Sequence, residues 1–183
     1  MTRVRRLVLA VSMMLALVIL DQATKEIAIH TLKGHAPIAF PKGWAPNDLF
    51  RFQFATNTGA FLSLFSTLDD SIRAWLLIGL NSVILVAVGA ILVARHTLSF
   101  GVTTALAWIL SGGVGNLIDR MFRGGEVVDF MNMGIGVGTW SLRTGIFNVA
   151  DLAIVGGLVL LVLLELFAPA PGKEEKAPAE KKR

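Results

Sequence analysis

The chain has 183 residues, of which 54% are hydrophobic and 16% are charged, and its mean hydropathy is +0.67. This composition is too apolar for an ordinary soluble domain and indicates an integral membrane protein. The formal net charge is +4, but the basic residues at both ends flank apolar segments, so membrane orientation explains them better than nucleic-acid binding. The absence of cysteine excludes a disulfide framework, a thiol nucleophile and a cysteine-based metal site.

The first predicted element is a membrane span over residues 7–29. Its apolar run follows three arginines and resembles the core of a signal peptide, but no small-x-small cleavage site follows it. The helical pattern instead continues through Asp21 and Lys25. These two residues are four positions apart, so they share a helix face and can neutralise each other near the outer interface.

Three further spans follow, because a helix of about 20 apolar residues crosses a bilayer. The uncharged stretches predict them over residues 74–94, 97–118 and 144–167. The expected fold class is therefore an all-α membrane protein with four transmembrane helices, forming a single domain over residues 1–168. Residues 169–183 are rich in Pro, Lys, Glu and Ala, a composition that predicts a disordered cytoplasmic tail.

Basic residues set the expected orientation of the four spans. Three arginines precede the first span, and Arg95 lies in the short turn between the second and third spans. By the positive-inside rule, both termini should be cytoplasmic. The connecting segments 30–73 and 119–143 are then extracytoplasmic.

The two extracytoplasmic segments carry strand patterns. Residues 50–54 alternate between apolar and polar side chains, and a turn is expected at residues 57–61. Residues 134–142 also alternate, although their glycines weaken the pattern. Because an open sheet edge cannot face lipid, these strands should form a small β platform above the membrane or on its surface.

Asp129 and Asp151 are the candidate catalytic residues. A carboxylate at the centre of the bilayer costs up to about 3 kcal/mol on insertion scales, so an acid near the hydrocarbon usually marks function. Asp151 lies more than one turn inside the fourth predicted span, whereas Asp129 lies on a predicted loop. Two carboxylates within about 3 Å share a proton, so one can act as a base on water while the other polarises a scissile carbonyl.

Asparagine side chains accompany the acids at helical spacing. Asn116 and Asp119 are three residues apart at the end of the third span, and Asn148 and Asp151 repeat that spacing at the start of the fourth. Amides can bind a developing oxyanion or a substrate backbone without changing the charge of the site. A simpler interpretation is that these residues cap helix ends and that Asp119 and Arg120 form interfacial ion pairs.

Five motifs occur in order along residues 7–167: Asp21-x-x-Thr24-Lys25, Asn57-x-Gly59-Ala-Phe61, Gly112-Gly-x-Gly115-Asn116-x-x-Asp119-Arg120, Val127-Val-Asp129-Phe130 and Phe147-Asn148-x-Ala150-Asp151. Together they resemble the signature blocks of lipoprotein signal peptidase (signal peptidase II), a family of bacterial aspartic membrane peptidases. The resemblance implies a multi-pass enzyme of the inner membrane with its active site at the outer face. Such an enzyme removes the signal peptide from diacylglyceryl-modified prolipoproteins, cutting just before the lipidated cysteine.

The resemblance also implies roles for individual residues. Asp129 and Asp151 match the catalytic pair. The residues that match site-lining or substrate-binding positions are Asn57, Gly59, Asn116, Arg120 and Asn148, and those that match supporting positions are Asp21, Lys25 and Asp119. The implied partners are lipid-modified prolipoproteins and membrane lipid, for a monomer that needs no metal, cofactor or nucleic acid. One departure is that the segment between Arg120 and Asp129 has one residue more than is usual in the family.

Two other functions fit parts of the pattern. A metal-dependent membrane phosphotransferase would also use carboxylates and asparagines, but its aspartates would be closely spaced on helices, and these are spread over three elements. A small proton-coupled transporter would place its acids near the midplane with a polar path across the membrane. The cytoplasmic halves of the predicted spans are almost wholly apolar, which disfavours transport.

Overall fold

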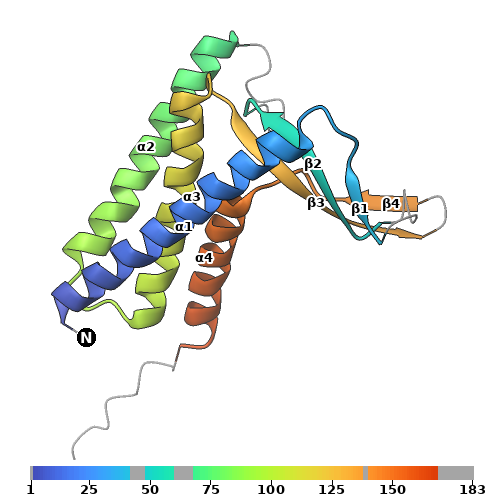
Figure 1. Ribbon diagram of the computed structural model, residues 1–183. Helices are drawn as coiled ribbons and strands as arrows, with labels where there is room; N and C mark the ends of the chain where they lie inside the picture. Colours follow the sequence, from blue (N-terminus) through green and yellow to red (C-terminus); the bar gives the residue numbers. More distant parts are fainter. Residues whose placement is uncertain (1, 42–47, 60–67, 138–139, 169–183) are drawn as a thin grey trace, which may run out of the picture.

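The computed structural model describes residues 2–41, 48–59, 68–137 and 140–168. Its elements in chain order are α1 (Arg3–Leu32), β1 (Ile38–Phe40), β2 (Phe50–Asn57), α2 (Asp70–Ala94), α3 (Phe100–Phe122), β3 (Val127–Val137), β4 (Trp140–Arg143) and α4 (Val149–Leu166). All 4 helices are long and apolar enough to cross a membrane. The strands form one antiparallel sheet that projects from one end of the helical bundle (Figure 1). The predicted fold class, four transmembrane helices with a small β platform, is confirmed.

α3 is the central helix of the bundle and packs against α1, α2 and α4. Glycines allow α3 and α4 to approach each other closely. A Cβ atom at Gly112 would clash with the backbone oxygen of Ala150, and one at Gly157 would lie 2.6 Å from the backbone oxygen of Ala105. Small residues commonly permit such close packing between membrane helices. The polar end of α3 is thereby held against the start of α4.

α4 begins at Val149, whereas the sequence predicts a span from residue 144. The segment before it is extended because Phe147 pairs with β3, and Asn148 then caps the helix. Asp151 is consequently in the first turn of α4, where it forms a capping box with Asn148. The inference that Asp151 lies more than one turn inside the helix is therefore wrong.

The connection from α3 to β3 also differs from the prediction. α3 runs to Phe122, beyond the predicted end at residue 118. A tight turn at Gly124 and Gly125 follows, with φ values of +67° and +90° that glycine adopts without strain. β3 then starts early enough to include Asp129, so this residue lies on a strand rather than on a loop.

The register of the sheet places the candidate residues near the bundle. The strand order is β1-β2-β3-β4. Asp129 of β3 lies opposite Ala55 of β2, and Asn57 lies opposite Val127. The strand predicted at residues 50–54 is part of β2. The segment predicted as one strand at residues 134–142 instead contains the end of β3 and the start of β4, which pair with each other.

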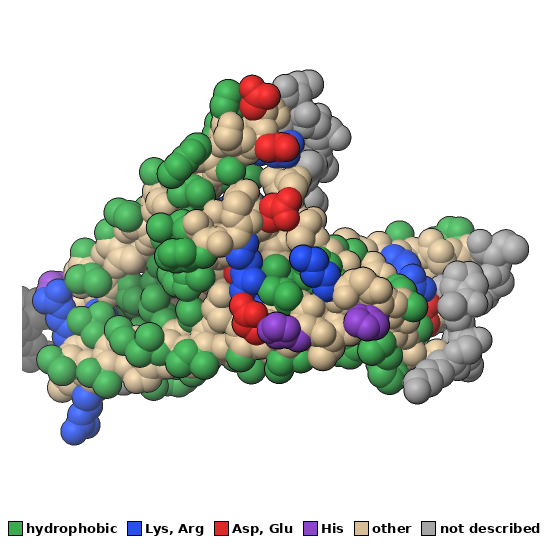
Figure 2. All heavy atoms as spheres, turned by 45° about the horizontal axis from the view of Figure 1, so that its top comes forward, with side chains coloured by type: hydrophobic (Ala, Val, Ile, Leu, Met, Phe, Trp, Pro, Cys, Tyr) green, Lys and Arg blue, Asp and Glu red, His purple; other side chains and the backbone are tan. Residues whose placement is uncertain are grey.

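The surface separates into apolar and charged regions. Figure 2 shows hydrophobic side chains over much of the helices, while acidic and basic side chains gather where the helices meet the sheet and basic ones lie at the N-terminal end of the bundle. The most hydrophobic 18-residue windows of α1, α2 and α4 are largely unburied in the protein itself. Such helices need lipid around them, which agrees with a multi-pass membrane protein.

Candidate active site

The two candidate catalytic acids come from different layers of the molecule. Asp129 lies on β3 and is 2% exposed, whereas Asp151 in the first turn of α4 is half-buried. The capping box fixes Asp151, because its backbone N–H donates to Asn148 Oδ1 at 2.9 Å and its Oδ2 accepts from the Asn148 N–H at 3.1 Å. Helix capping and site geometry therefore depend on the same two side chains.

Two asparagine amides connect the carboxylates. Asn148 Nδ2 donates to Asp129 Oδ1 at 2.7 Å, and Asn116 Nδ2 donates to Asp151 Oδ1 at 2.9 Å. Asn148 Nδ2 also lies 3.1 Å from Asn116 Oδ1. The structure thus brings Asn116 and Asn148 together with both acids in one polar cluster, as the sequence spacing predicts.

Burial and the nearby charge of Asp151 raise the pKa of Asp129 to about 6. Hydrogen bonds from Asn57 and Asn148 act in the opposite direction, because they stabilise the ionised form. A carboxyl with this pKa still holds a proton in mildly acidic solution. The charge of the neighbouring carboxylate therefore favours one proton on the pair.

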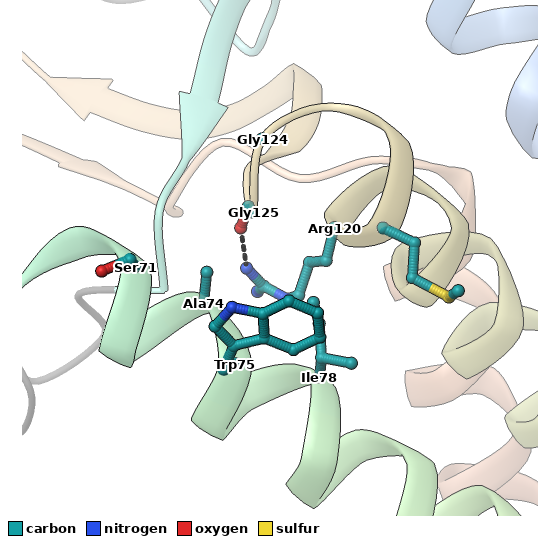
Figure 3. Close-up of a pocket in the computed structure, with 8 residues that line it drawn as sticks. Ser71, Ala74, Trp75, Ile78, Arg120, Gly124 and Gly125 are labelled. Carbon is teal, nitrogen blue, oxygen red and sulfur yellow. Dashed lines mark hydrogen bonds between the residues drawn. The ribbon is translucent and has the colours of Figure 1, made fainter.

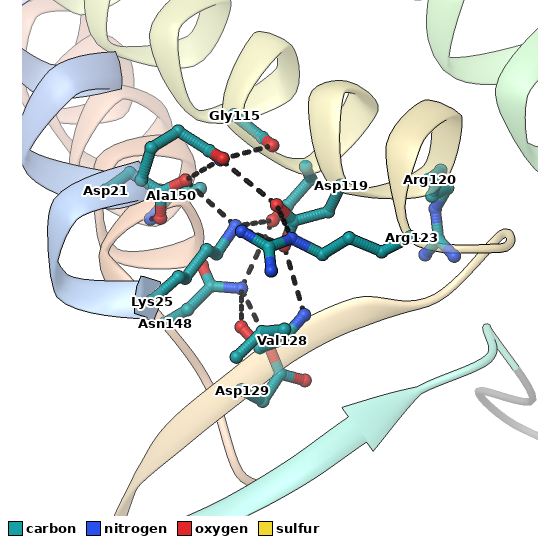
Figure 4. Close-up of polar contacts among 12 residues, drawn as sticks. Asp21, Lys25, Gly115, Asp119, Arg120, Arg123, Val128, Asp129, Asn148 and Ala150 are labelled. Carbon is teal, nitrogen blue, oxygen red and sulfur yellow. Dashed lines mark hydrogen bonds and ion pairs between the residues drawn. The ribbon is translucent and has the colours of Figure 1, made fainter. Parts of the chain in front are cut away.

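Lys25 is the centre of a buried ion cluster close to Asp129 (Figure 4). Its Nζ lies 2.8 Å from Asp21 Oδ2 and 2.9 Å from Asp119 Oδ2, and it donates to Asn116 Oδ1 at 3.1 Å. The predicted pair between Asp21 and Lys25 is present, and Asp119 pairs with Lys25 and Arg123 rather than with Arg120. A buried ammonium with three oxygen partners is fully hydrogen-bonded, as a buried charge requires.

The two acids of this cluster also hold the backbone beside the candidate catalytic residues. Asp119 Oδ2 accepts from the backbone N–H of Val128 at 3.0 Å, and Asp21 Oδ1 accepts from that of Ala150 at 2.9 Å. Val128 precedes Asp129, and Ala150 precedes Asp151. Each supporting aspartate therefore fixes the position of the main chain one residue before a catalytic candidate.

Gln22 and Arg123 belong to this cluster but were missed by the sequence analysis. Gln22 Nε2 lies 3.1 Å from oxygens of Asp21, Asp119 and Gly115. Arg123 Nε donates to Asp119 Oδ1 at 3.2 Å. In the sequence, only their positions indicate that these two residues belong to the cluster. Gln22 adjoins Asp21 inside a motif, and Arg123 lies four residues after Asp119.

Asn57 at the end of β2 and Gly59 after it lie beside Arg120 of α3. The backbone N–H of Gly59 donates to Asn57 Oδ1 at 2.9 Å, and Gly59 has φ +80°. Arg120 Nη1 donates to the backbone oxygen of Gly125 at 2.9 Å. This guanidinium lines a pocket of about 340 Å³, and Figure 3 shows it beside Trp75. A Cβ at Gly59 would lie 3.6 Å from Arg120 Nη1, so the turn packs directly on the arginine.

The donor set does not form a metal centre in the part of the chain that the structure describes. No three His, Cys, Asp or Glu side chains converge there as a ligand group. The position between Asp21 and Asp119 that a cation would favour is taken by the Lys25 ammonium.

Comparisons with known proteins show the family of the chain. The sequence model of the family described as signal peptidase (SPase) II matches residues 13–167. The chain is 37% identical over 151 residues to a lipoprotein signal peptidase of Chlorobium phaeobacteroides, covering 80% of this chain and 83% of that protein. It is 33% identical over 168 residues to a lipoprotein signal peptidase of Mycobacterium tuberculosis, covering 89% of this chain and 73% of that protein.

The fold is also similar to that of a solved bacterial membrane enzyme. The TM-score is 0.70 with 24% sequence identity, and the match covers 87% of this chain and 94% of that one. Neither the phosphotransferase nor the transporter alternative is supported by any of these similarities. Since the family pattern and the relatives extend over most of its length, the chain belongs to the signal peptidase II family of membrane peptidases.

Proposed function

We propose that Asp129 and Asp151 are the catalytic pair with which this peptidase removes the signal peptide from lipid-modified prolipoproteins, cutting just before the lipidated cysteine. The observation that carries the proposal is the bridge of two amides, in which Asn148 binds Asp129 and Asn116 binds Asp151. This bridge holds both carboxyls in one polar cluster at the junction of helix and sheet.

In the proposed mechanism the two acids divide the proton transfers. Asp129 has the raised pKa, so it holds the shared proton and donates a hydrogen bond to the scissile carbonyl oxygen. Asp151 acts as the base and accepts a proton from the water molecule as the water oxygen attacks the carbonyl carbon. When the intermediate collapses, the C–N bond breaks and the leaving nitrogen takes a proton from the pair. The titration belongs to the pair as a whole.

The remaining residues of the cluster have binding and positioning roles in this proposal. Asn57 and Arg120 line the approach to Asp129 and can hydrogen-bond the substrate backbone. Asp21, Lys25 and Asp119 position the catalytic segments through the backbone hydrogen bonds of Val128 and Ala150.

The proposed setting is the bacterial inner membrane. A lipid-modified substrate stays in the bilayer, so its bond must be cut at the membrane surface. Both termini of a monomeric enzyme would then be cytoplasmic, with the catalytic pair and the sheet at the outer face. The arginines before the first span support this orientation through the positive-inside rule.

Cleavage of a purified lipidated prolipoprotein by Asp129→Asn and Asp151→Asn variants tests the assignment. An amide can neither accept the proton of water nor cycle as an acid, so each variant should lose activity by at least about a hundredfold while inserting and purifying normally. Asp69→Asn is the matched control, because Asp69 is exposed and its side chain makes no capping hydrogen bond. Turnover within about tenfold of the unmodified enzyme in either variant would overturn the pair. Inhibition by EDTA would favour the metal-dependent alternative.

A further inference from the structure

A groove opens on the side of the helical bundle between α2 and α4. Both helices pack against α3, and α2 makes its main contacts with α3 rather than with α4. The space left between them has a volume of about 190 Å³, and its apolar walls include Leu80, Ile84 and Ile154. Since Leu80 and Ile84 are about half exposed in the protein alone, this groove faces the hydrocarbon of the membrane.

The groove leads to the proposed catalytic pair. Asn116 and Arg120 line it together with the apolar residues, and Asn116 donates its amide hydrogen bond to Asp151 at 2.9 Å. A signal segment that is apolar and embedded in the bilayer could therefore reach the pair sideways, without leaving the lipid. This step rests on the function proposed above.

Asn81 is a polar residue in this wall that neither the motifs nor the proposed mechanism uses. It lies in α2, whose most apolar window has a hydropathy of 2.7. Its Nδ2 donates to the backbone oxygen of Gly113 at 3.0 Å. Among the described residues, no donor is paired with its Oδ1, and the side chain is not fully buried. An amide in an apolar helix thus offers an acceptor to the groove.

A bound substrate would supply a donor for that acceptor. A peptide bond that is to be attacked must be extended, so the residues around it lose the hydrogen bonds of a helix. A backbone N–H without a partner in hydrocarbon is strongly unfavourable, and a side-chain oxygen at the right depth would accept a hydrogen bond from it.

The depth of Asn81 in the membrane indicates which backbone N–H of the substrate it can bind. Asn81 is level with Gly113, which is three residues before Asn116 and therefore about 4.5 Å deeper along α3. An extended peptide advances about 3.3 Å per residue. We infer that Asn81 is a positioning residue that accepts a hydrogen bond from the backbone N–H of the first or second residue on the signal-peptide side of the cleaved bond.

Kinetics of Asn81→Leu with two kinds of substrate test this inference. One substrate is a lipidated prolipoprotein peptide with normal amides, and in the other an ester replaces the amide whose N–H belongs to the first or second residue before the cleaved bond, which removes that N–H. With the amide substrate, Asn81→Leu should raise KM by about tenfold to a hundredfold and leave kcat nearly unchanged, because the hydrogen bond is made in both the bound and the transition state. With the ester substrate, the same substitution should have no further effect.

Ser82→Ala is the matched control in the same helix. The Ser82 hydroxyl donates to the backbone oxygen of Ile78 at 2.7 Å, so its loss should affect both substrates equally and slightly. A purely structural role of Asn81, through its bond to Gly113, would lower the thermal unfolding temperature and kcat for both substrates. If Asn81→Leu raises the KM of the ester substrate by the same factor as that of the amide substrate, the inference is overturned.

The test remains decisive if Asn81→Leu does not fold. In that case a scan of esters along the substrate is made with the unmodified enzyme, and the loss of affinity should be confined to the first or second position. An equal loss at the fifth position would overturn the inference. Failure of the proposed function gives a different pattern, in which the unmodified enzyme does not cleave the amide substrate or Asp129→Asn remains active.

Discussion

At the scale of single residues, Asn57 and Asn148 affect the proton affinity of Asp129 as well as its position. An amide carries no titrating proton, so the sequence alone predicts that replacing Asn57 or Asn148 leaves the pH profile of cleavage unchanged. In the structure both residues hydrogen-bond Asp129 and lower its pKa against the effect of burial. The amides therefore set the proton affinity of the acid as well as its position.

The pH dependence of kcat/KM follows from this contact. Asp129 is protonated below about pH 6 and ionised above it. Because the mechanism needs one proton on the pair, activity should fall as the pH rises through this region. Asn57→Ala removes a hydrogen bond to the ionised form, so the pKa of Asp129 should rise and the alkaline limb should move to higher pH. Thr58→Ala, in the same turn, is the control. If the alkaline limb of the pH profile is unchanged in Asn57→Ala, the hydrogen bond from Asn57 to Asp129 does not form in the working enzyme.

At the scale of elements, α1, α3 and β3 are joined by the charge cluster around Lys25. Asp119→Asn removes one of the two carboxylates that neutralise this buried ammonium. The variant should lose about 3 kcal/mol of stability, because breaking a buried pair leaves a charge without full compensation. It should also lose activity, since the backbone N–H of Val128 is held by the same carboxylate.

Thermal unfolding in detergent and a cleavage assay measure both effects. Glu26→Gln is the control, because Glu26 is exposed and its pair with Arg123 at 2.8 Å is open to solvent. Loss of an exposed pair changes stability by about 0 to 1 kcal/mol. Equal destabilisation in the two variants would show that the charge on Asp119 is not required by Lys25.

The helices of this protein can be predicted from its sequence more readily than the strands. Long uncharged runs specify a membrane span by length and composition alone, so all four helices were found. The start of α4 was misplaced because the pairing of Phe147 with β3, a contact distant in sequence, decides where the helix begins. Likewise Val127 and Val128 favour a strand, but only the pairing with β2 places Asp129 on it.

At the scale of the whole molecule, five short motifs located the polar cluster because each contributes side chains to one junction of helices and sheet. The sequence could not show which partners they find there. Lys25 contacts Asp119 and Asn116 across more than ninety positions of the chain, and such contacts depend on how closely α1 and α3 pack. Asn81 belongs to no motif, and only its place in the groove indicates a role.

The orientation of the molecule in the membrane is the remaining property on which the proposed function depends. Reporter fusions after Gly34 and Gly134 should report the extracytoplasmic side, and fusions after His96 and at the C-terminus should report the cytoplasm. Four spans with an inner N-terminus allow no other pattern. Replacing the three arginines before the first span with glutamine is the matched variant, because it removes basic residues on which the positive-inside rule depends, and it should weaken or mix the signals. An outer signal at the C-terminus of the unmodified chain would place the catalytic pair on the cytoplasmic side or require an odd number of spans, and either result would contradict cleavage at the outer face.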